Sequence, residues 1–162
     1  MTKFISNFLR LALIGITGLI VFISIMIGLG TIPAMIQLYP GNDWLFYTII
    51  TGIYVSVVFF AYGMFQAFML LRNFELHETF TVKTGLRLAK IKYAALAIGG
   101  LYVLGSPFAY IWAQIEDAPG LLLIELIFGG LSFAVAAFAK LSQNIVAEGT
   151  ITKKQTDNLE AN

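Results

Sequence analysis

Glu125 is the residue whose type and position point most clearly to chemistry. It lies about six residues into an apolar segment that begins near Pro119, roughly 8–9 Å along a helix from that proline. An ionisable side chain in an apolar segment is costly, and such residues usually face a cavity or a partner. No basic residue lies in the same half of the apolar segments to pair with it. We therefore treat Glu125 as a candidate proton or cation site.

A structural role for Glu125 is the competing interpretation. Long charged side chains near the end of a membrane helix can extend to the surface, and Glu125 is not deep in its segment. The carboxylate could equally be hydrogen-bonded to Tyr102, Ser106 or Tyr110. The sequence leaves open whether this carboxylate is buried or reaches the outer surface.

Two amides and an acidic turn are the other polar features of the apolar regions. Gln66 and Gln114 lie in or at the end of apolar segments, where polar side chains ordinarily hydrogen-bond between helices. The acidic turn directly precedes the segment of Glu125, and together they form a candidate ligand site. The turn residues in this prediction are Glu116, Asp117, Pro119 and Gly120.

Small residues recur at helical spacing in the last two apolar segments. Ala95 and Gly99 are four positions apart, as are Gly130 and Ala134. Such pairs let two helices approach closely. A broken-helix substrate site of the transporter kind is the alternative, but we favour close packing.

Basic residues gather in the second half of the only long polar interval, residues 72–90. On a helix, Lys83, Arg87 and Lys90 fall at i, i+4 and i+7, on one face, with Lys92 close by. This face could bind anionic headgroups, at about 1 kcal/mol per basic residue, or an acidic cytoplasmic protein. The simpler interpretation is a topology determinant that only contacts lipid.

The composition argues against most enzyme classes. Hydrophobic residues make up 59% of the chain and charged residues 12%, against roughly half and a quarter in soluble domains. The sequence has no cysteine for thiolate chemistry and one histidine, too few for a bis-histidine haem site. HExxH, GxSxG, Walker and nucleic-acid-binding motifs are missing. We expect a non-enzymatic integral membrane protein without metal or cofactor and without direct nucleic-acid binding.

Four apolar segments are long enough to cross a hydrocarbon layer of about 30 Å as helices. We place these spans at about 11–30, 44–71, 91–115 and 119–140. Pro107 should kink the third span. The fold prediction is an all-α bundle of four antiparallel transmembrane helices in a lipid bilayer.

The segments outside the spans have expected roles of their own. Thr81 is a plausible N-cap for a helix that starts at Val82 and runs directly into the third span. His77 is expected to be a solvated loop residue. Residues 149–162 are expected to form a flexible polar tail.

The distribution of basic residues predicts the orientation. Segments 31–43 and 114–120 contain no Lys or Arg, and all ten lie in the N-terminal, central and C-terminal segments. Positively charged segments stay in the cytoplasm. We therefore expect both termini and the central interval to be cytoplasmic.

Several marks together resemble a bacterial family of four-span membrane proteins, domain of unknown function 2975. They are Phe80-Thr81 at a helix start, Ile91-Lys92-Tyr93 at the entry to the third span, Pro107 within it, and Asp117-Ala118-Pro119-Gly120 before the fourth. The marks cover about residues 70–140, and the first two spans match only in hydropathy. Members often carry two aspartates before Ala-Pro-Gly, where this chain has Glu116-Asp117, which keeps the charge.

The resemblance implies a location in the bacterial cytoplasmic (inner) membrane and no established activity. Family members are commonly encoded beside a small Cro-like helix-turn-helix regulator, which implies a membrane partner of a cytoplasmic DNA-binding protein. We therefore expect a non-enzymatic sensor or regulatory partner. The alternative is a small transporter-like or permease subunit, a homo-oligomer, that uses Glu125. The third hypothesis is a purely structural subunit of a larger membrane complex.

Overall fold

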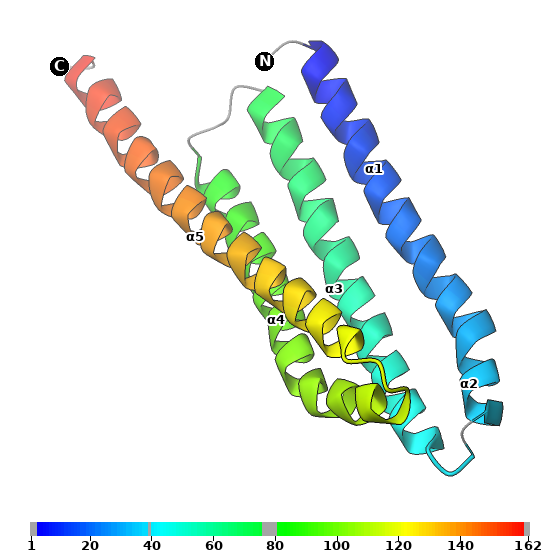
Figure 1. Ribbon diagram of the computed structural model, residues 1–162. Helices are drawn as coiled ribbons and strands as arrows, with labels where there is room; N and C mark the ends of the chain where they lie inside the picture. The colour runs from blue at the N-terminus through cyan, green and yellow to red at the C-terminus, as the bar shows by residue number, and fades with distance from the viewer. Residues whose placement is uncertain (1–2, 39, 76–80, 161–162) are drawn as a thin grey trace.

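The computed structural model describes residues 3–38, 40–75 and 81–160, and these are helices joined by short turns, with no strand (Figure 1). His77 and Phe80 lie outside the described residues. The elements in chain order are α1 (Lys3–Met26), the π-helix η1 (Ile27–Thr31), α2 (Ile32–Leu38), α3 (Asp43–Glu75), α4 (Val82–Ile115) and α5 (Gly120–Glu160).

Four of these elements are long and apolar enough to cross a membrane, namely α1 with η1, α3, α4 and α5. The fold is therefore an all-α bundle of four transmembrane helices. Both chain ends and the start of α4 lie at one end of it, which we call the basic end (Figure 1). The turns between α2 and α3 and between α4 and α5 lie at the opposite end, which we call the acidic end because it carries Glu116 and Asp117.

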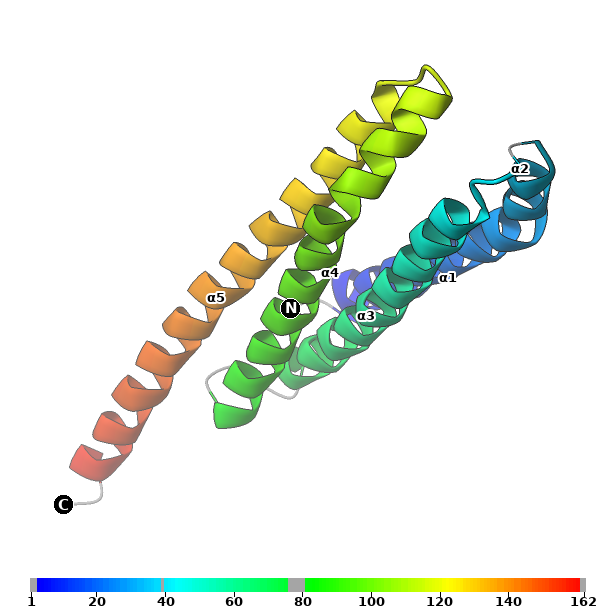
Figure 2. The same cartoon turned by 90° about the horizontal axis from the view of Figure 1, so that it is seen from below.

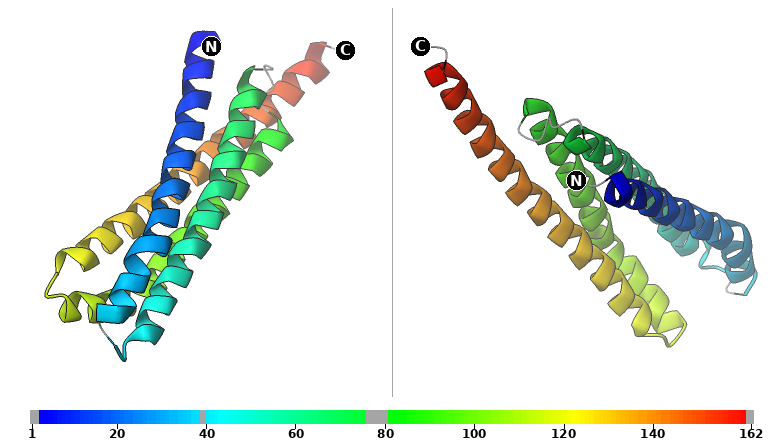
Figure 3. Two further views of the ribbon diagram at one scale, coloured as in Figure 1. Left: turned by 90° about the vertical axis from the view of Figure 1, so that its right-hand side faces the viewer. Right: turned by 90° about the horizontal axis from the view of Figure 1, so that it is seen from above.

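The helices pack in chain order, each mainly against its neighbour. α5 lies along α4, α4 along α3, and α1 against α3, so α1 and α5 are the outer members (Figures 2 and 3). Most large apolar side chains of α1 and α5 are exposed. In a bilayer, these faces contact lipid.

Aromatic contacts hold α3 against α4 at the acidic end. Leu45 and Phe46, in the first turn of α3, are almost completely buried. The Phe46 ring meets Trp112 edge-on at 5.6 Å between centroids, and Trp44 meets Phe108 in the same way at 6.3 Å. Edge-to-face pairs of this kind add to the stabilisation from burial alone.

Small residues form the contact between α4 and α5. Ala95 and Gly99 are buried as expected, and a Cβ on Gly99 would lie 2.9 Å from the Phe133 ring of α5. Gly130 and Ala134, also expected to let two helices approach closely, are exposed instead: a Cβ on Gly130 meets nothing within 4 Å, and Gly130 only borders the cavity between α4 and α5. The α5 residues that face α4 are instead Gly129, Ala136, Ala139 and Val146, at spacings of seven and three.

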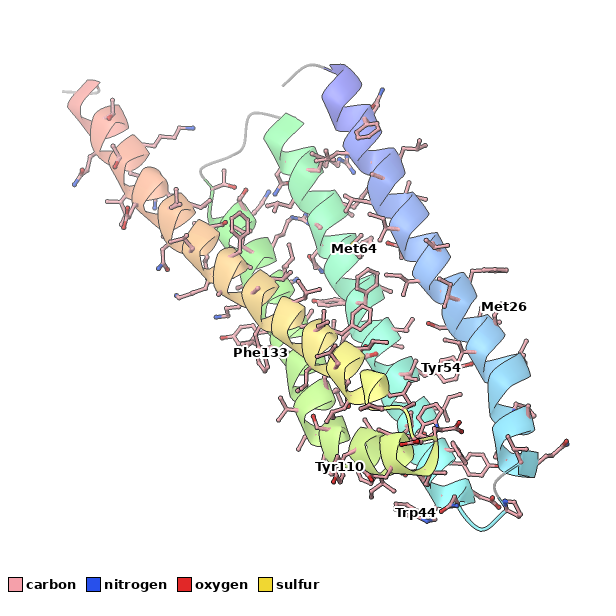
Figure 4. All side chains as sticks on the ribbon, viewed as in Figure 1. Met26, Trp44, Tyr54, Met64, Tyr110 and Phe133 are labelled. Atoms are coloured by element: carbon pink, nitrogen blue, oxygen red, sulfur yellow. The ribbon has the colours of Figure 1, made fainter. Side chains whose placement is uncertain are left out.

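The first helix extends beyond its predicted end. Instead of stopping at Gly30, it passes through one π-helical turn and continues as α2 to Leu38. A π-turn leaves helical carbonyls open to other donors, and such turns are frequent at functional sites. Here the Tyr54 hydroxyl points from α3 toward α1 and donates to the Ser24 carbonyl at 3.4 Å (Figure 4).

Two helices are much longer than a bilayer requires. α4 has 34 residues and α5 has 41, or about 51 and 62 Å at 1.5 Å per residue, against about 30 Å of hydrocarbon. α4 includes the basic segment and the third span in one helix. α5 runs to Glu160. The sequence suggests a polar tail from residue 149, but this segment is helical as far as Glu160.

Candidate functional site

A small cavity lies between α4 and α5, toward the acidic end. Its volume is about 150 Å³. Its walls come from one stretch of each helix, and Glu125 is its only ionisable carboxylate. The side chains that shape it are Tyr102, Val103, Ser106, Glu125, Leu126 and Phe133.

The Glu125 carboxylate is held against the backbone of α4. The missing side chain of Gly105 makes room for it, since a Cβ there would lie 2.8 Å from Oε1. Its other oxygen, Oε2, is buried and has no hydrogen-bond partner within the described residues. Buried polar atoms in folded proteins are almost always paired, so an unpaired carboxylate oxygen beside a cavity indicates a missing partner.

The hydrogen bonds considered for Glu125 from the sequence do not form among the described residues. Ser106 instead donates to the Tyr102 carbonyl of its own helix at 3.0 Å. The Tyr102 hydroxyl lies near Ser56 of α3, and the Tyr102 ring stacks on Phe128 of α5 with 6.2 Å between the ring centroids. Tyr102 therefore connects the three helices α3, α4 and α5 beside the cavity.

Pro107 leaves one backbone carbonyl of α4 without its usual donor. α4 remains helical through this proline and bends in its last turns (Figure 1). A proline has no N–H to donate four residues back, so the Val103 carbonyl loses its usual helical donor. Val103 itself is one of the residues that line the cavity.

The acidic turn is a helix cap separate from this cavity. Asp117 has φ of 50°, and the Ala118 N–H donates to the Ala113 carbonyl at 2.9 Å. This is the Schellman pattern that ends many helices. None of Glu116, Asp117, Pro119 and Gly120 lines the cavity. Glu116 has its own buried oxygen, Oε1, without a hydrogen-bond partner in the described structure.

The two candidate amides lie in different surroundings. Gln66 is 5% exposed in α3, on the buried side of that helix with Gly63 and Asn73, whereas Gln114 is exposed at the end of α4. Gly63 faces Ala94 of α4, with 3.6 Å between the position of its missing Cβ and the Ala94 Cβ. Gln66 is therefore placed within the bundle, and Gln114 is at the surface.

The basic residues lie at the first turns of α4. Thr81 caps the helix as expected, accepting from the Thr84 N–H at 3.3 Å. Lys83 and Lys90 are exposed, and Arg87 and Lys92 are partly exposed. The Lys92 ammonium sits 4.2 Å from the centre of the Tyr93 ring.

An exposed apolar stripe runs beside these basic residues, and the sequence analysis missed it. Val82, Leu86 and Tyr93 are all more than half exposed, at i, i+4 and i+11. On a helix, this stripe is adjacent to Lys83 and Lys90. The signal was present in the sequence as a helical period of apolar residues within a basic segment.

The cavity walls also carry a signal that sequence reasoning did not use. Gly129 and Phe133 follow Glu125 at i+4 and i+8, the spacing of one helix face. Within the described residues, no three acidic or histidine side chains come together as a metal site would require.

Comparisons with known proteins agree with this architecture. The sequence model of a family described as "Protein of unknown function (DUF2975)" matches residues 31–158. The chain is also 31% identical over 159 residues to the uncharacterized membrane protein YoaS of Bacillus subtilis (strain 168), an alignment that covers 97% of this chain and 98% of that protein. No solved structure matches. The resemblance drawn from residues 70–140 is confirmed; the family model extends it to residues 31–158, and the relative extends it to nearly the whole chain.

Proposed function

We propose, on the premise that the chain belongs to the DUF2975 family of proteins of unknown function, that it is a non-enzymatic membrane sensor. In this proposal it controls a cytoplasmic protein from the bacterial cytoplasmic membrane, with the basic end inside the cell. One observation carries the proposal: α4 is a single helix from Val82 to Ile115. It brings the basic face and one wall of the Glu125 cavity onto the same rigid element.

The continuity of α4 supplies a mechanism for signalling. A ligand that enters the cavity must push on or draw together α4 and α5, because these helices form its walls. α4 is one continuous helix from Val82 to Ile115, so a shift at the cavity also displaces its first turns. The first turns of α4 extend beyond the hydrocarbon layer, and there a small tilt moves the basic residues relative to α5.

The surface at the start of α4 favours a partner with an acidic, amphipathic face. Lys83 and Lys90 lie along one side of the exposed stripe of Val82 and Leu86. α4 contains no Asp or Glu over its whole length. A helix with apolar anchors and acidic flanks would match both the stripe and the charge. We expect this partner to be a small cytoplasmic DNA-binding regulator.

Affinity purification from the native cell in a gentle detergent tests this function. We expect a small DNA-binding protein in near-equal amount to the chain, identified by mass spectrometry. Recovery of the chain alone, or of copies of itself only, would contradict the regulatory role.

The unpaired Oε2 of Glu125 favours a second candidate, a homo-oligomeric transporter-like subunit that moves a proton or a cation. In this case Glu125→Gln should abolish ion movement in proteoliposomes followed with a pH-sensitive dye, while Glu116→Gln should leave it unchanged. A sensor that transports nothing would give no flux with the wild-type chain either.

A further inference from the structure

The charge of the cavity calls for a positively charged ligand. Glu125 contributes a carboxylate with a buried oxygen that lacks a partner within the described residues. From Tyr93 to Ala139 the sequence has no Lys or Arg, so α4 and α5 offer no internal counter-ion at this depth. A charge left unpaired in an apolar environment is costly; a proton on the carboxylate removes that cost, and so does a bound cation.

The walls favour an organic ammonium over a bare metal ion. Tyr102 and Phe133 line the cavity, and Phe128 stacks behind Tyr102. Aromatic faces attract ammonium groups, and tyrosine and phenylalanine cages bind quaternary ammonium in this way. Metal ions such as Mg²⁺ and Ca²⁺ require several oxygen ligands, whereas the side chains here provide one carboxylate and the Ser106 hydroxyl. A cavity of about 150 Å³ has room for a ring the size of benzene, which is enough for a trimethylammonium group.

The position of the opening indicates a ligand that arrives from the bilayer. Val103 and Leu126 line the cavity and are 57% and 56% exposed. They belong to the apolar parts of α4 and α5, and α5 is an outer member of the bundle (Figure 3). The exposed rim therefore faces lipid, so a ligand in the cavity can leave a hydrocarbon tail among the lipid chains.

We propose that this cavity binds the ammonium head of a membrane-partitioned amphiphile, with Glu125 as its counter-ion. Tyr102 and Phe133 line the space that the head occupies. The ammonium can come from the headgroup of an ethanolamine or choline lipid, or from a free long-chain amine or quaternary ammonium compound. The biological role of this ligand rests on the proposed sensor function, whereas its binding to the cavity does not.

Binding by the purified chain tests the proposal. In maltoside detergent, dodecyltrimethylammonium and dodecylammonium should raise the melting temperature saturably, and dodecanol should not. Glu125→Gln keeps the shape of the side chain and should weaken the binding of both cations by about tenfold or more. Glu116→Gln, the matched loss of an acidic group at the same end, should bind as the wild type does.

A second pair of variants keeps the test valid if Glu125→Gln fails to fold. Gly105→Ala places a Cβ 2.8 Å from the present position of Oε1 and should displace the carboxylate, whereas a Cβ on Gly100 meets nothing within 4 Å. We expect weaker cation binding for Gly105→Ala and unchanged binding for Gly100→Ala. Equal binding by Glu125→Gln and wild type, or equal effects of dodecanol and the cations, would overturn the proposal.

The source of the ammonium follows from one further comparison. If a lipid headgroup is the ligand, dodecyltrimethylammonium should bind more weakly in nanodiscs of phosphatidylethanolamine than in nanodiscs of phosphatidylglycerol, because phosphatidylethanolamine competes for the cavity. Equal binding in the two lipids would assign the site to a free amphiphile. Because no partner protein is present, failure here overturns the ligand class and leaves the partner interaction of the basic face untouched.

Discussion

Gly105 of α4 and Glu125 of α5 meet so closely that a Cβ on the glycine would lie 2.8 Å from the carboxylate Oε1. This contact places the Glu125 carboxylate against the backbone of α4, and the first turns of α4 carry the basic face. In the proposed sensor, a change in the charge or occupancy of Glu125 acts on α4 through this contact. The proposed sensor depends on this contact at one end of α4 and on the surface of its first turns at the other.

The basic face should bind the partner through its charge. Replacing Lys83, Arg87 and Lys90 together with glutamine should abolish partner recovery in affinity purification, while membrane insertion stays intact. The matched control is replacement of Lys140, Lys153 and Lys154 on α5, three exposed residues with the same total charge. Partner recovery that is equal in the two triple variants would show that this face only contacts lipid.

The packing between α4 and α5 should be sensitive at Gly99. Gly99→Ala brings a Cβ to within 2.9–3.1 Å of the Phe133 ring, and overpacking of this kind costs about 1–3 kcal/mol. We expect a lower melting temperature in detergent, with recovery when Phe133→Leu is added. A Cβ on Gly100 has open space around it, so Gly100→Ala should have the melting temperature of the wild type. An equal decrease in melting temperature for both glycine variants would argue against this contact.

Asp117 should act as a helix cap. Its φ of 50° is tolerated by aspartate and is favourable for glycine. Asp117→Gly should therefore keep or raise the thermal stability, and Asp117→Val should lower it by about 1–2 kcal/mol. If Asp117 were instead a ligand group, Asp117→Gly would lose binding of the ammonium probe while melting normally.

The contact between α1 and α3 should depend on Gly28 and Tyr54. A Cβ on Gly28 would overlap the Tyr54 hydroxyl, so Gly28→Ala should push aside the side chain that donates to the Ser24 carbonyl. A lower melting temperature is expected, and Tyr54→Phe in the same chain should recover part of it. Gly18→Ala, which meets nothing within 4 Å, is the control, and identical melting of the two alanine variants would contradict the contact.

Local signals allowed much of the fold to be predicted. The helix that starts after Thr81 follows from a capping side chain and a helical period that runs unbroken into an apolar span. The end of α5 was not predicted, because the polar composition after Gly149 resembles a tail, and helical hydrogen bonds along a continuing helix are not visible in composition. The helical continuation through η1 to Leu38 was missed because residues 31–43 hold two prolines and a Pro-Gly turn signal, whereas Pro33 lies in the first turn of α2, where proline is tolerated.

The contacts between helices could not be predicted from the sequence. The small residues of α5 were assigned to Gly130 when Gly129 faces α4, and one position rotates a helix face by about 100°. The cavity could not be predicted either, because it depends on which residues of α4 lie opposite Glu125. Glu125 itself was found because a carboxylate in an apolar span is conspicuous without any knowledge of its neighbours.

The central claim is that a change at Glu125 moves the basic segment of α4. The chain has no cysteine, so spin labels can be placed at Lys83→Cys on α4 and Glu148→Cys on α5, both exposed, and the distance between them measured by pulsed electron paramagnetic resonance in nanodiscs. We predict that Glu125→Gln shifts the distance distribution, and that Glu116→Gln does not. Identical distributions for Glu125→Gln and the wild type would contradict the claim.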